Sequence, residues 1–163
     1  MPTIHNAQYN PRGKQRACEY VFPYGDKSFD VALAASLFTH LRPFEGERYL
    51  EEVSRVLRPG GRLLGTWFLI DEKAEELLRS SRSASLEDAP TLDHEFTDEH
   101  GNTFRSPFAG TPEHMITIDE QLVRDQHDRA SLEIVEVLYG SWREGPGRGW
   151  PGQDMVVSRR SAK

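Results

Sequence analysis

Two short apolar runs flank one amphipathic helical stretch, and this arrangement limits the fold more than any other feature of the chain. Phe29–Ala35 and Leu63–Ile70 are apolar on both alternating faces, which is typical of strands inside a parallel sheet. Between them, Gly46–Leu57 repeats its apolar residues at helical spacing, and a Pro-Gly-Gly sequence at 59–61 ends the helix. A strand, a helix and a second strand in this order favour an α/β protein.

Further elements continue the pattern on both sides of this unit. They are expected as a strand at Glu19–Phe22, a short helix from Asp71 to Leu78, a polar hairpin at His94–Phe104, a helix from a Thr117/Glu120 capping box to about Ala130, and strands at Leu132–Tyr139 and Met155–Ser158. The predicted fold class is therefore α/β, with a mostly parallel sheet, an antiparallel C-terminal hairpin and flanking helices. We expect a single domain over residues 1–163, with an irregular or hairpin insertion at 81–116.

Charge, cysteine content and hydropathy exclude several classes of protein. The 163 residues carry a formal net charge of −6, which argues against a nucleic-acid partner. A single cysteine, Cys18, rules out a disulfide framework and a cysteine-based zinc site. The start of the chain lacks the apolar core of a signal peptide, and no apolar stretch is long enough to span a membrane. We therefore expect a cytoplasmic protein with no membrane partner.

Two segments carry a resemblance to a known family. Phe22–Leu41 reads FPYGDKSFDVALAASLFTHL, and Tyr49–Leu64 reads YLEEVSRVLRPGGRLL. They resemble the passage around the fourth strand and the following helix–turn–strand of the class I S-adenosylmethionine-dependent methyltransferases. Together with Tyr9–Gly13 and Gln153–Val157, the likeness covers most of the chain. It implies a partial Rossmann-like sheet holding the fourth to seventh strands of that family.

The resemblance leaves out the first half of the family's domain. In the family, the first strand ends in a G-x-G-x-G turn beside the methionine part of the cofactor, and the second ends in an acid that binds the ribose. Neither feature stands in the corresponding place here, and the Gly-rich candidates are Gly60-Gly61 and the stretch Gly145–Gly152. Gly60 and Gly65 do not form a phosphate loop, because Thr66 and Trp67 follow in place of Lys and Ser or Thr. The chain therefore resembles a truncated methyltransferase.

The family likeness also implies a cofactor, S-adenosylmethionine, and positions that contact it. The loop after the third strand would contact the adenine, and the end of the fourth strand would border the methionine part and the substrate. The positions in this chain are Asn6, Ala7, Ala35, Ser36 and Phe38. His40 is a candidate general base for an oxygen or nitrogen nucleophile. The alternatives are a strand end built of small residues for packing, and a histidine that only packs or starts a helix.

Other candidate residues have simpler explanations beside the functional ones. Trp67, Phe68 and Asp71 could line an acceptor pocket, but neighbouring strand residues face opposite ways, so at least one of the aromatic pair belongs to the core. Asp71 also suits a helix cap. The acids and histidines of 93–100 suggest a solvated hairpin tip rather than a metal site. Ser36 lacks the G-x-S-x-G context of a serine hydrolase.

Two functions remain open at this point. One is methyl transfer from S-adenosylmethionine to a small-molecule acceptor, in a chain completed by an N-terminal segment or a partner. The other is a catalytically inactive methyltransferase remnant that serves as a binding or assembly module. In both cases we expect the edge of Phe29–Ala35 to pair with a second copy or another chain, unless Met1–Arg16 folds over it.

Overall fold

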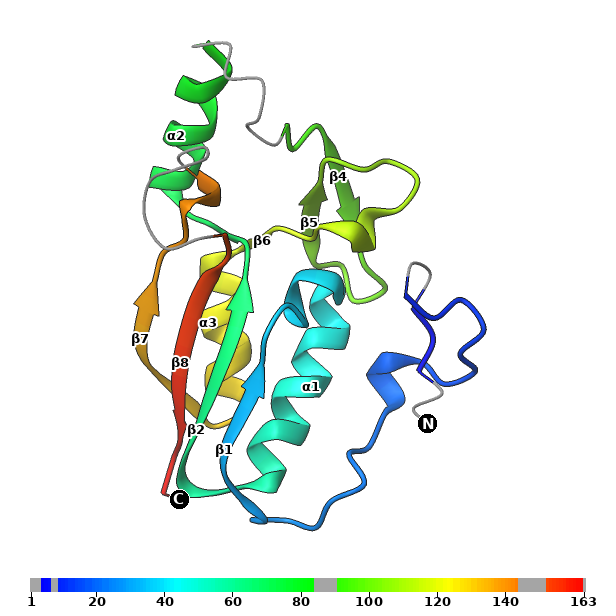
Figure 1. Cartoon of the computed structure of the whole chain (residues 1–163), viewed down its shortest axis with the longest axis vertical. Helices are drawn as coiled ribbons and strands as arrows, with labels where there is room; N and C mark the ends of the chain where they lie inside the picture. The colour runs from blue at the N-terminus through cyan, green and yellow to red at the C-terminus, as the bar shows by residue number, and fades with distance from the viewer. Residues whose placement is uncertain (1–3, 7–8, 84–90, 144–151, 163) are drawn as a thin grey trace.

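A four-stranded mixed sheet is the largest sheet in the part of the molecule that the structure describes (Figure 1). The structure is a computed structural model, and it describes residues 4–6, 9–83, 91–143 and 152–162. The strand order is β1 (Phe29–Ala34), β2 (Leu57–Trp67), β8 (Asp154–Arg160) and β7 (Leu132–Leu138). β1 and β2 are parallel, whereas β8 is antiparallel to both of its neighbours. The predicted α/β class and the antiparallel C-terminal hairpin are therefore confirmed.

Two helices share one core with this sheet. Leu50 and Val53 of α1 (Pro43–Val56) and Val123 of α3 (Glu120–Arg129) join the same buried cluster as Leu63 and Trp67 of β2. Helix α1 begins three residues before the predicted start because Pro43 suits the first helical position. The Glu45 carboxylate also accepts a hydrogen bond from the Arg42 backbone N–H at 3.0 Å. α1 therefore packs against the sheet in the same core as β2 and α3.

β1 forms one edge of the sheet and is open on one face. Ala34 faces the core, whereas the alternating side chains of Val31 and Leu33 are 59% and 73% exposed. Within the described residues, β1 pairs with β2 alone. Burial on both faces was expected from the apolar sequence, and it is wrong for β1. The apolar pattern is present, but no described helix or strand covers that side.

Most of the smaller elements lie beyond the carboxyl ends of β1 and β2, whereas the 3-10 helix at Ala17–Glu19 lies beside α1 (Figure 1). They are β3 (Leu69–Ile70) parallel to β6 (Ile118–Asp119), α2 (Glu72–Ser83), the hairpin of β4 (His94–Thr97) and β5 (Thr103–Ser106), and the 3-10 helices at Ala17–Glu19, Phe38–His40, Pro112–His114 and Ser141–Arg143. The predicted helix and polar hairpin are confirmed. No helix in the described ranges has both the length and the apolar character needed to cross a bilayer.

Two local predictions are wrong because tertiary contacts replace the expected ones. Residues 19–22 form the end of a 3-10 turn and an irregular stretch rather than a strand, and the Phe22 N–H donates to the Glu52 carboxylate at 2.7 Å. The cap of α3 is Asp119, whose side chain accepts from the Leu122 N–H at 3.1 Å. The Thr117 hydroxyl instead donates to the Arg105 carbonyl at 3.0 Å. Thr117 forms an isolated bridge with Arg105 of β5, so its hydroxyl does not cap the helix.

A buried ion pair ties β8 to the segment after β7. Asp154 is 0% exposed and Arg143 is 3% exposed. The Asp154 carboxylate accepts from the Leu69 N–H at 2.7 Å, the Gly140 N–H at 2.8 Å and the Trp142 indole at 2.8 Å. Burial raises the pKa of Asp154, while these hydrogen bonds and the Arg143 guanidinium lower it. This cluster holds β3, residues 140–143 and the start of β8 together at the carboxyl end of β2.

Candidate functional site

Three polar side chains from different parts of the chain form a hydrogen-bonded group at the carboxyl end of β1. The Ser36 N–H donates to the Thr66 hydroxyl at 2.7 Å, and the Thr66 hydroxyl donates to the Gln153 side-chain oxygen at 2.6 Å. The Ser36 hydroxyl lies 3.2 Å from the same Gln153 oxygen. Ser36 has a φ of 51°, a left-handed conformation that serine adopts only when its surroundings hold it there. Ala35 and Ser36 are consequently exposed at the strand end.

Phe38 and Trp67 lie behind this strand end. Phe38 is 3% exposed, and its ring stacks on Trp67 with centroids 4.2 Å apart. Trp67 is therefore the core member of the Trp67–Phe68 pair, and Phe68 packs edge-on against Trp142. The Phe38 ring faces the interior. Its predicted contact with a cofactor stays a prediction.

The structure brings Asn6 and His40 together, although they were predicted from separate parts of the sequence. The Asn6 side-chain amide donates to the His40 carbonyl at 3.2 Å. The His40 Nδ1 lies 2.8 Å from the carbonyl oxygen of Glu113, and the Tyr9 hydroxyl lies 3.2 Å from Nε2. Ala7 lies outside the described residues. Tyr9 and Glu113 were not singled out as site residues from the sequence, although Tyr9 begins one of the segments that carry the family likeness.

A small pocket of about 180 Å³ adjoins this histidine. It is lined by His5, Asn6, Arg16, Arg42, Phe44, Glu45, Glu99 and Glu113. Arg42 pairs with Glu113 at 2.8 Å, and Arg16 pairs with Glu99 at 2.5 Å. Burial is the main cause that raises the pKa of Glu45 above its ordinary value. The two arginines connect the N-terminal segment and the start of α1 to the hairpin region.

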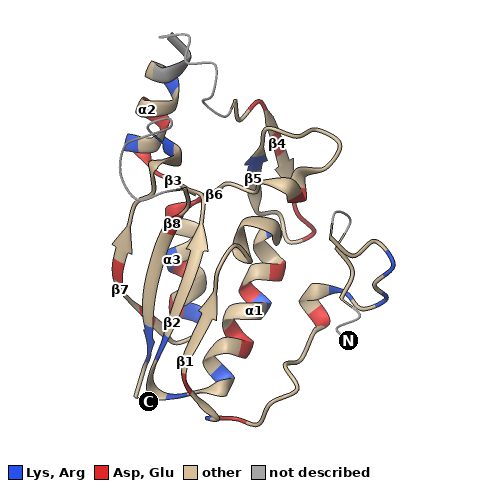
Figure 2. Ribbon diagram, viewed as in Figure 1, with Lys and Arg blue, Asp and Glu red and all other residues tan. Residues whose placement is uncertain are grey.

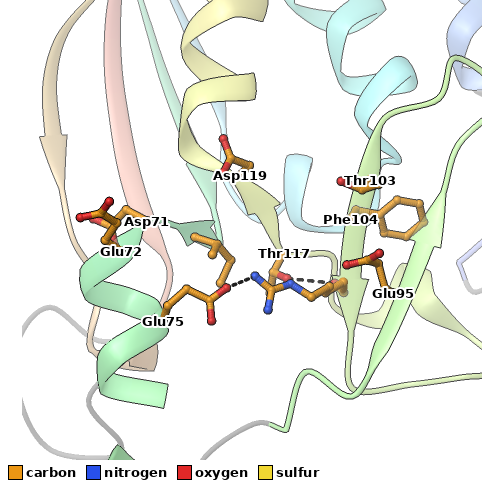
Figure 3. A pocket seen from close by; sticks show the side chains of 10 residues that line it. Asp71, Glu72, Glu75, Glu95, Thr103, Phe104, Thr117 and Asp119 are labelled. Carbon is orange, nitrogen blue, oxygen red and sulfur yellow. Dashed lines mark hydrogen bonds and ion pairs between the residues drawn. The ribbon is translucent and has the colours of Figure 1, made fainter. Parts of the chain in front are cut away.

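A larger pocket of about 440 Å³ lies between α2 and the β4–β5 hairpin (Figure 3). It is lined by Ile70, Asp71, Glu72, Glu75, Glu95, Thr103, Phe104, Arg105, Thr117 and Asp119. Arg105 reaches across it and pairs with Glu75 of α2. Asp71 lines this pocket and also caps α2, because its carboxylate accepts from the Ala74 N–H at 2.7 Å. The helix-cap interpretation of Asp71 is therefore confirmed, and its part in binding an acceptor stays a prediction.

The acidic tip of the β4–β5 hairpin was expected to be solvated, but one of its carboxylates is buried and hydrogen-bonded. Asp98 is buried, and its carboxylate accepts from the Phe44 N–H at 3.0 Å and the Asn102 N–H at 2.9 Å. The tip is thereby fixed to the start of α1. Throughout the described ranges, no group of three histidine, cysteine or carboxylate side chains is arranged to hold a metal ion.

Comparison with known proteins finds a family that resembles the N-terminal part of the chain. A family model described as a methyltransferase domain matches residues 3–65, which include β1, α1 and most of β2. The match covers less than half of the chain, and it shows that residues 3–65 are similar to this family. This segment also contains every position that we predicted for the cofactor and for catalysis, from Asn6 to His40. The family resemblance stated from the sequence is confirmed.

Solved methyltransferase structures share the fold over nearly the whole chain. An S-adenosylmethionine-dependent methyltransferase from Methanosarcina mazei is 22% identical, with a TM-score of 0.54, covering 91% of this chain and 66% of its own. The 1,6-didemethyltoxoflavin-N1-methyltransferase of Burkholderia thailandensis, solved with its namesake ligand and S-adenosylhomocysteine, is 14% identical (TM-score 0.50; 90% and 49% covered). A methyltransferase from Mesorhizobium loti is 13% identical (TM-score 0.51; 90% and 68% covered). The chain thus spans between about half and two thirds of these proteins.

If S-adenosylmethionine bound at the carboxyl edge of the sheet, the described residues would supply only one wall of its site. Ala35 and Ser36 present small side chains at the carboxyl edge, where ligands of such sheets bind. Gly60 and Gly61, in contrast, lie near the amino end of β2, at the opposite end of the sheet. The other Gly-rich candidate, Gly145–Gly152, lies almost entirely outside the described residues. These residues do not by themselves fit the whole cofactor.

Proposed function

We propose that the chain is the acceptor side of an S-adenosylmethionine-dependent methyltransferase that acts on a small molecule. The main observation behind this proposal is the hydrogen bond between Asn6 and His40, which lie near the carboxyl ends of the parallel strands β1 and β2. Ligands of open α/β sheets bind beyond this edge, where the loops after the strands form a crevice. The family match over residues 3–65 supports the same assignment.

The chain's own residues would contribute positioning and a proton acceptor. In this proposal, Asn6, Ala7, Ala35 and Ser36 form the cofactor wall, with the buried Phe38 ring supporting it from behind. The larger pocket beside Asp71 receives the acceptor. S-adenosylmethionine would supply the methyl group when bound. Holding two reactants in line provides much of the acceleration of such a transfer. His40 would take the proton of an oxygen or nitrogen nucleophile.

Kinetic variants separate the roles of Ser36 and His40 in a preparation that shows turnover. Ser36→Leu is expected to raise the KM for the cofactor with little change in kcat, because the larger side chain fills the open strand end. His40→Ala is expected to lower kcat about 10²-fold, the lower range for loss of a general base. Ser36→Asn, which tolerates the left-handed backbone, and His94→Ala on the exposed hairpin are the matched controls. Unchanged kinetics in both test variants would remove these residues from the site.

The open edge of β1 supports a partner for this chain. Edge strands are normally protected by charges or bulges. β7, at the opposite edge, has a register irregularity between Ile134 and Glu136, and it carries charged residues that Figure 2 shows in red. β1 has its own charge and register shift at Asp30, but from Val31 to Ala34 it has no charged residue and pairs regularly with β2. The difference suggests that the β1 edge is completed by another segment or chain, in an active enzyme or in an assembly module.

Lysine substitutions test whether copies of the chain pair through this edge. We expect the wild-type chain to be a dimer and Leu33→Lys or Val31→Lys to make it monomeric, because a two-fold contact would bury both charges. Light scattering after size exclusion measures this directly. Val135→Lys, at an exposed position on the β7 edge, should leave the dimer intact. A wild-type chain that stays monomeric at high micromolar concentration would contradict self-association.

A further inference from the structure

The hydrogen-bond pattern of His40 determines which ring nitrogen carries the proton. Nδ1 lies 2.8 Å from the Glu113 backbone carbonyl. A carbonyl oxygen only accepts hydrogen bonds, so Nδ1 must be the donor. A neutral imidazole has a single N–H, and Nε2 is therefore left with a lone pair.

The Glu113 carbonyl is held in place by contacts on both sides. The Glu113 side chain is buried and accepts hydrogen bonds from Arg42 Nη2 at 2.8 Å and Nε at 3.1 Å. Arg42 directly precedes α1, so the carbonyl is anchored to the first turn of that helix. On the other side, the Ile116 N–H donates to the Thr39 carbonyl at 2.9 Å. The 3-10 helix Pro112–His114 is therefore fixed beside the histidine.

Tyr9 approaches the remaining nitrogen of the ring. Its hydroxyl lies 3.2 Å from Nε2 and 3.4 Å from Nδ1, and the two rings meet edge-on with centroids 4.7 Å apart. Because Nδ1 is engaged by the carbonyl, the hydroxyl can donate only to Nε2. The Tyr9 N–H donates to the Asn6 side-chain oxygen at 3.0 Å, which keeps the ring near His40. Tyr9 is 60% exposed and can give way to a ligand.

We propose that Arg42 and Glu113 are positioning residues that hold His40 as the Nδ1–H tautomer, and that the Tyr9 hydroxyl marks the place from which a proton reaches Nε2. The source of that proton, an acceptor hydroxyl or amine, rests on the proposed function. In the step, the acceptor's O–H or N–H bond breaks and its electron pair stays on the acceptor atom. A new N–H bond forms at Nε2, and Nδ1–H continues to donate to Glu113.

Nitrogen-15 NMR of the imidazole rings tests the tautomer without cofactor or turnover. The His40 signals are assigned by their loss in His40→Gln. At a pH where the ring is neutral, we expect Nδ1 to have the nitrogen-15 chemical shift of a protonated nitrogen. Nε2 should have the chemical shift of an unprotonated nitrogen. The exposed His94 provides the internal reference for an unconstrained ring. A protonated Nε2 and an unprotonated Nδ1 at His40 would overturn the proposal.

Two variants test the positioning residues and Tyr9 separately. Arg42→Gln, or Glu113→Gln if the first is poorly folded, should move the His40 shifts toward those of His94. Arg129→Gln removes an exposed ion pair with Glu47 elsewhere on the surface and should leave them unchanged. Tyr9→Phe should keep the tautomer but shift the Nε2 resonance. Unmoved shifts in both Gln variants would overturn the role of Arg42 and Glu113, and an unmoved Nε2 in Tyr9→Phe would overturn that of Tyr9.

Failure of this inference can be distinguished from failure of the proposed function. The tautomer depends only on contacts within the chain. If His40 has the expected tautomer but His40→Ala leaves kcat unchanged, the positioning by Arg42 and Glu113 stands and the catalytic role of His40 falls.

Discussion

Replacing Asp154 with alanine is expected to lower the free energy of unfolding by about 3–5 kcal/mol, the usual cost of breaking a buried ion pair from one side. The variant would leave the buried Arg143 guanidinium without its Asp154 partner, which lies 3.2 Å away. It would also leave the Leu69 and Gly140 N–H groups and the Trp142 indole without their acceptor. Urea unfolding at neutral pH, followed by tryptophan fluorescence and circular dichroism, measures the change.

Two further variants serve as controls for the Asp154→Ala measurement. Asp154→Asn keeps the shape and one acceptor oxygen, so its loss of stability should be smaller than that of Asp154→Ala. Asp30→Ala removes the partner of Arg58 at the surface, where ion pairs contribute little, and should change stability hardly at all. If Asp154→Ala is no less stable than Asp30→Ala, the buried pair does not hold these segments together.

The sequence predicted those elements whose hydrophobic pattern is local. The strands β1 and β2 and the helix α1 between them follow from apolar spacing and from the Pro-Gly-Gly stop. The exposed face of β1 could not be predicted, because Val31 and Leu33 have the same residue types as buried strand positions. Thr117 has the right spacing for a helix cap, but pairing with Arg105 outcompetes it. Tertiary contacts decide such cases.

Only part of the candidate site could be predicted from the sequence, namely residues that contribute through their side chains. The family likeness pointed to Asn6 and His40 separately, and the structure joins them. Glu113 acts on His40 through its backbone carbonyl, a group that every residue has and that leaves no signal in the sequence. Gln153 lies 117 positions from Ser36 in the chain, so their contact follows from the order of the strands. Neither could be found by spacing alone.

The isolated chain is expected to bind S-adenosylmethionine weakly or not at all. Of the cofactor wall, the described residues supply small side chains at the end of β1, and residues 1–28 contain Gly13 and Gly25 as their only glycines. Neither forms the G-x-G-x-G turn that the family places after its first strand. Hydrogen bonds to charged groups contribute about 1.5–3 kcal/mol each. Without two such contacts, affinity should fall about 10²–10⁴-fold relative to a complete site.

Calorimetric titration of the isolated full chain with S-adenosylhomocysteine tests the central claim most directly. This ligand keeps the adenosine and amino-acid parts of the cofactor and cannot be consumed during the measurement. The claim is that the chain provides one side of a methyltransferase site, which is completed by a segment or partner at the β1 edge. It predicts no saturable heat in the micromolar range. A one-to-one micromolar site on the monomer would contradict it.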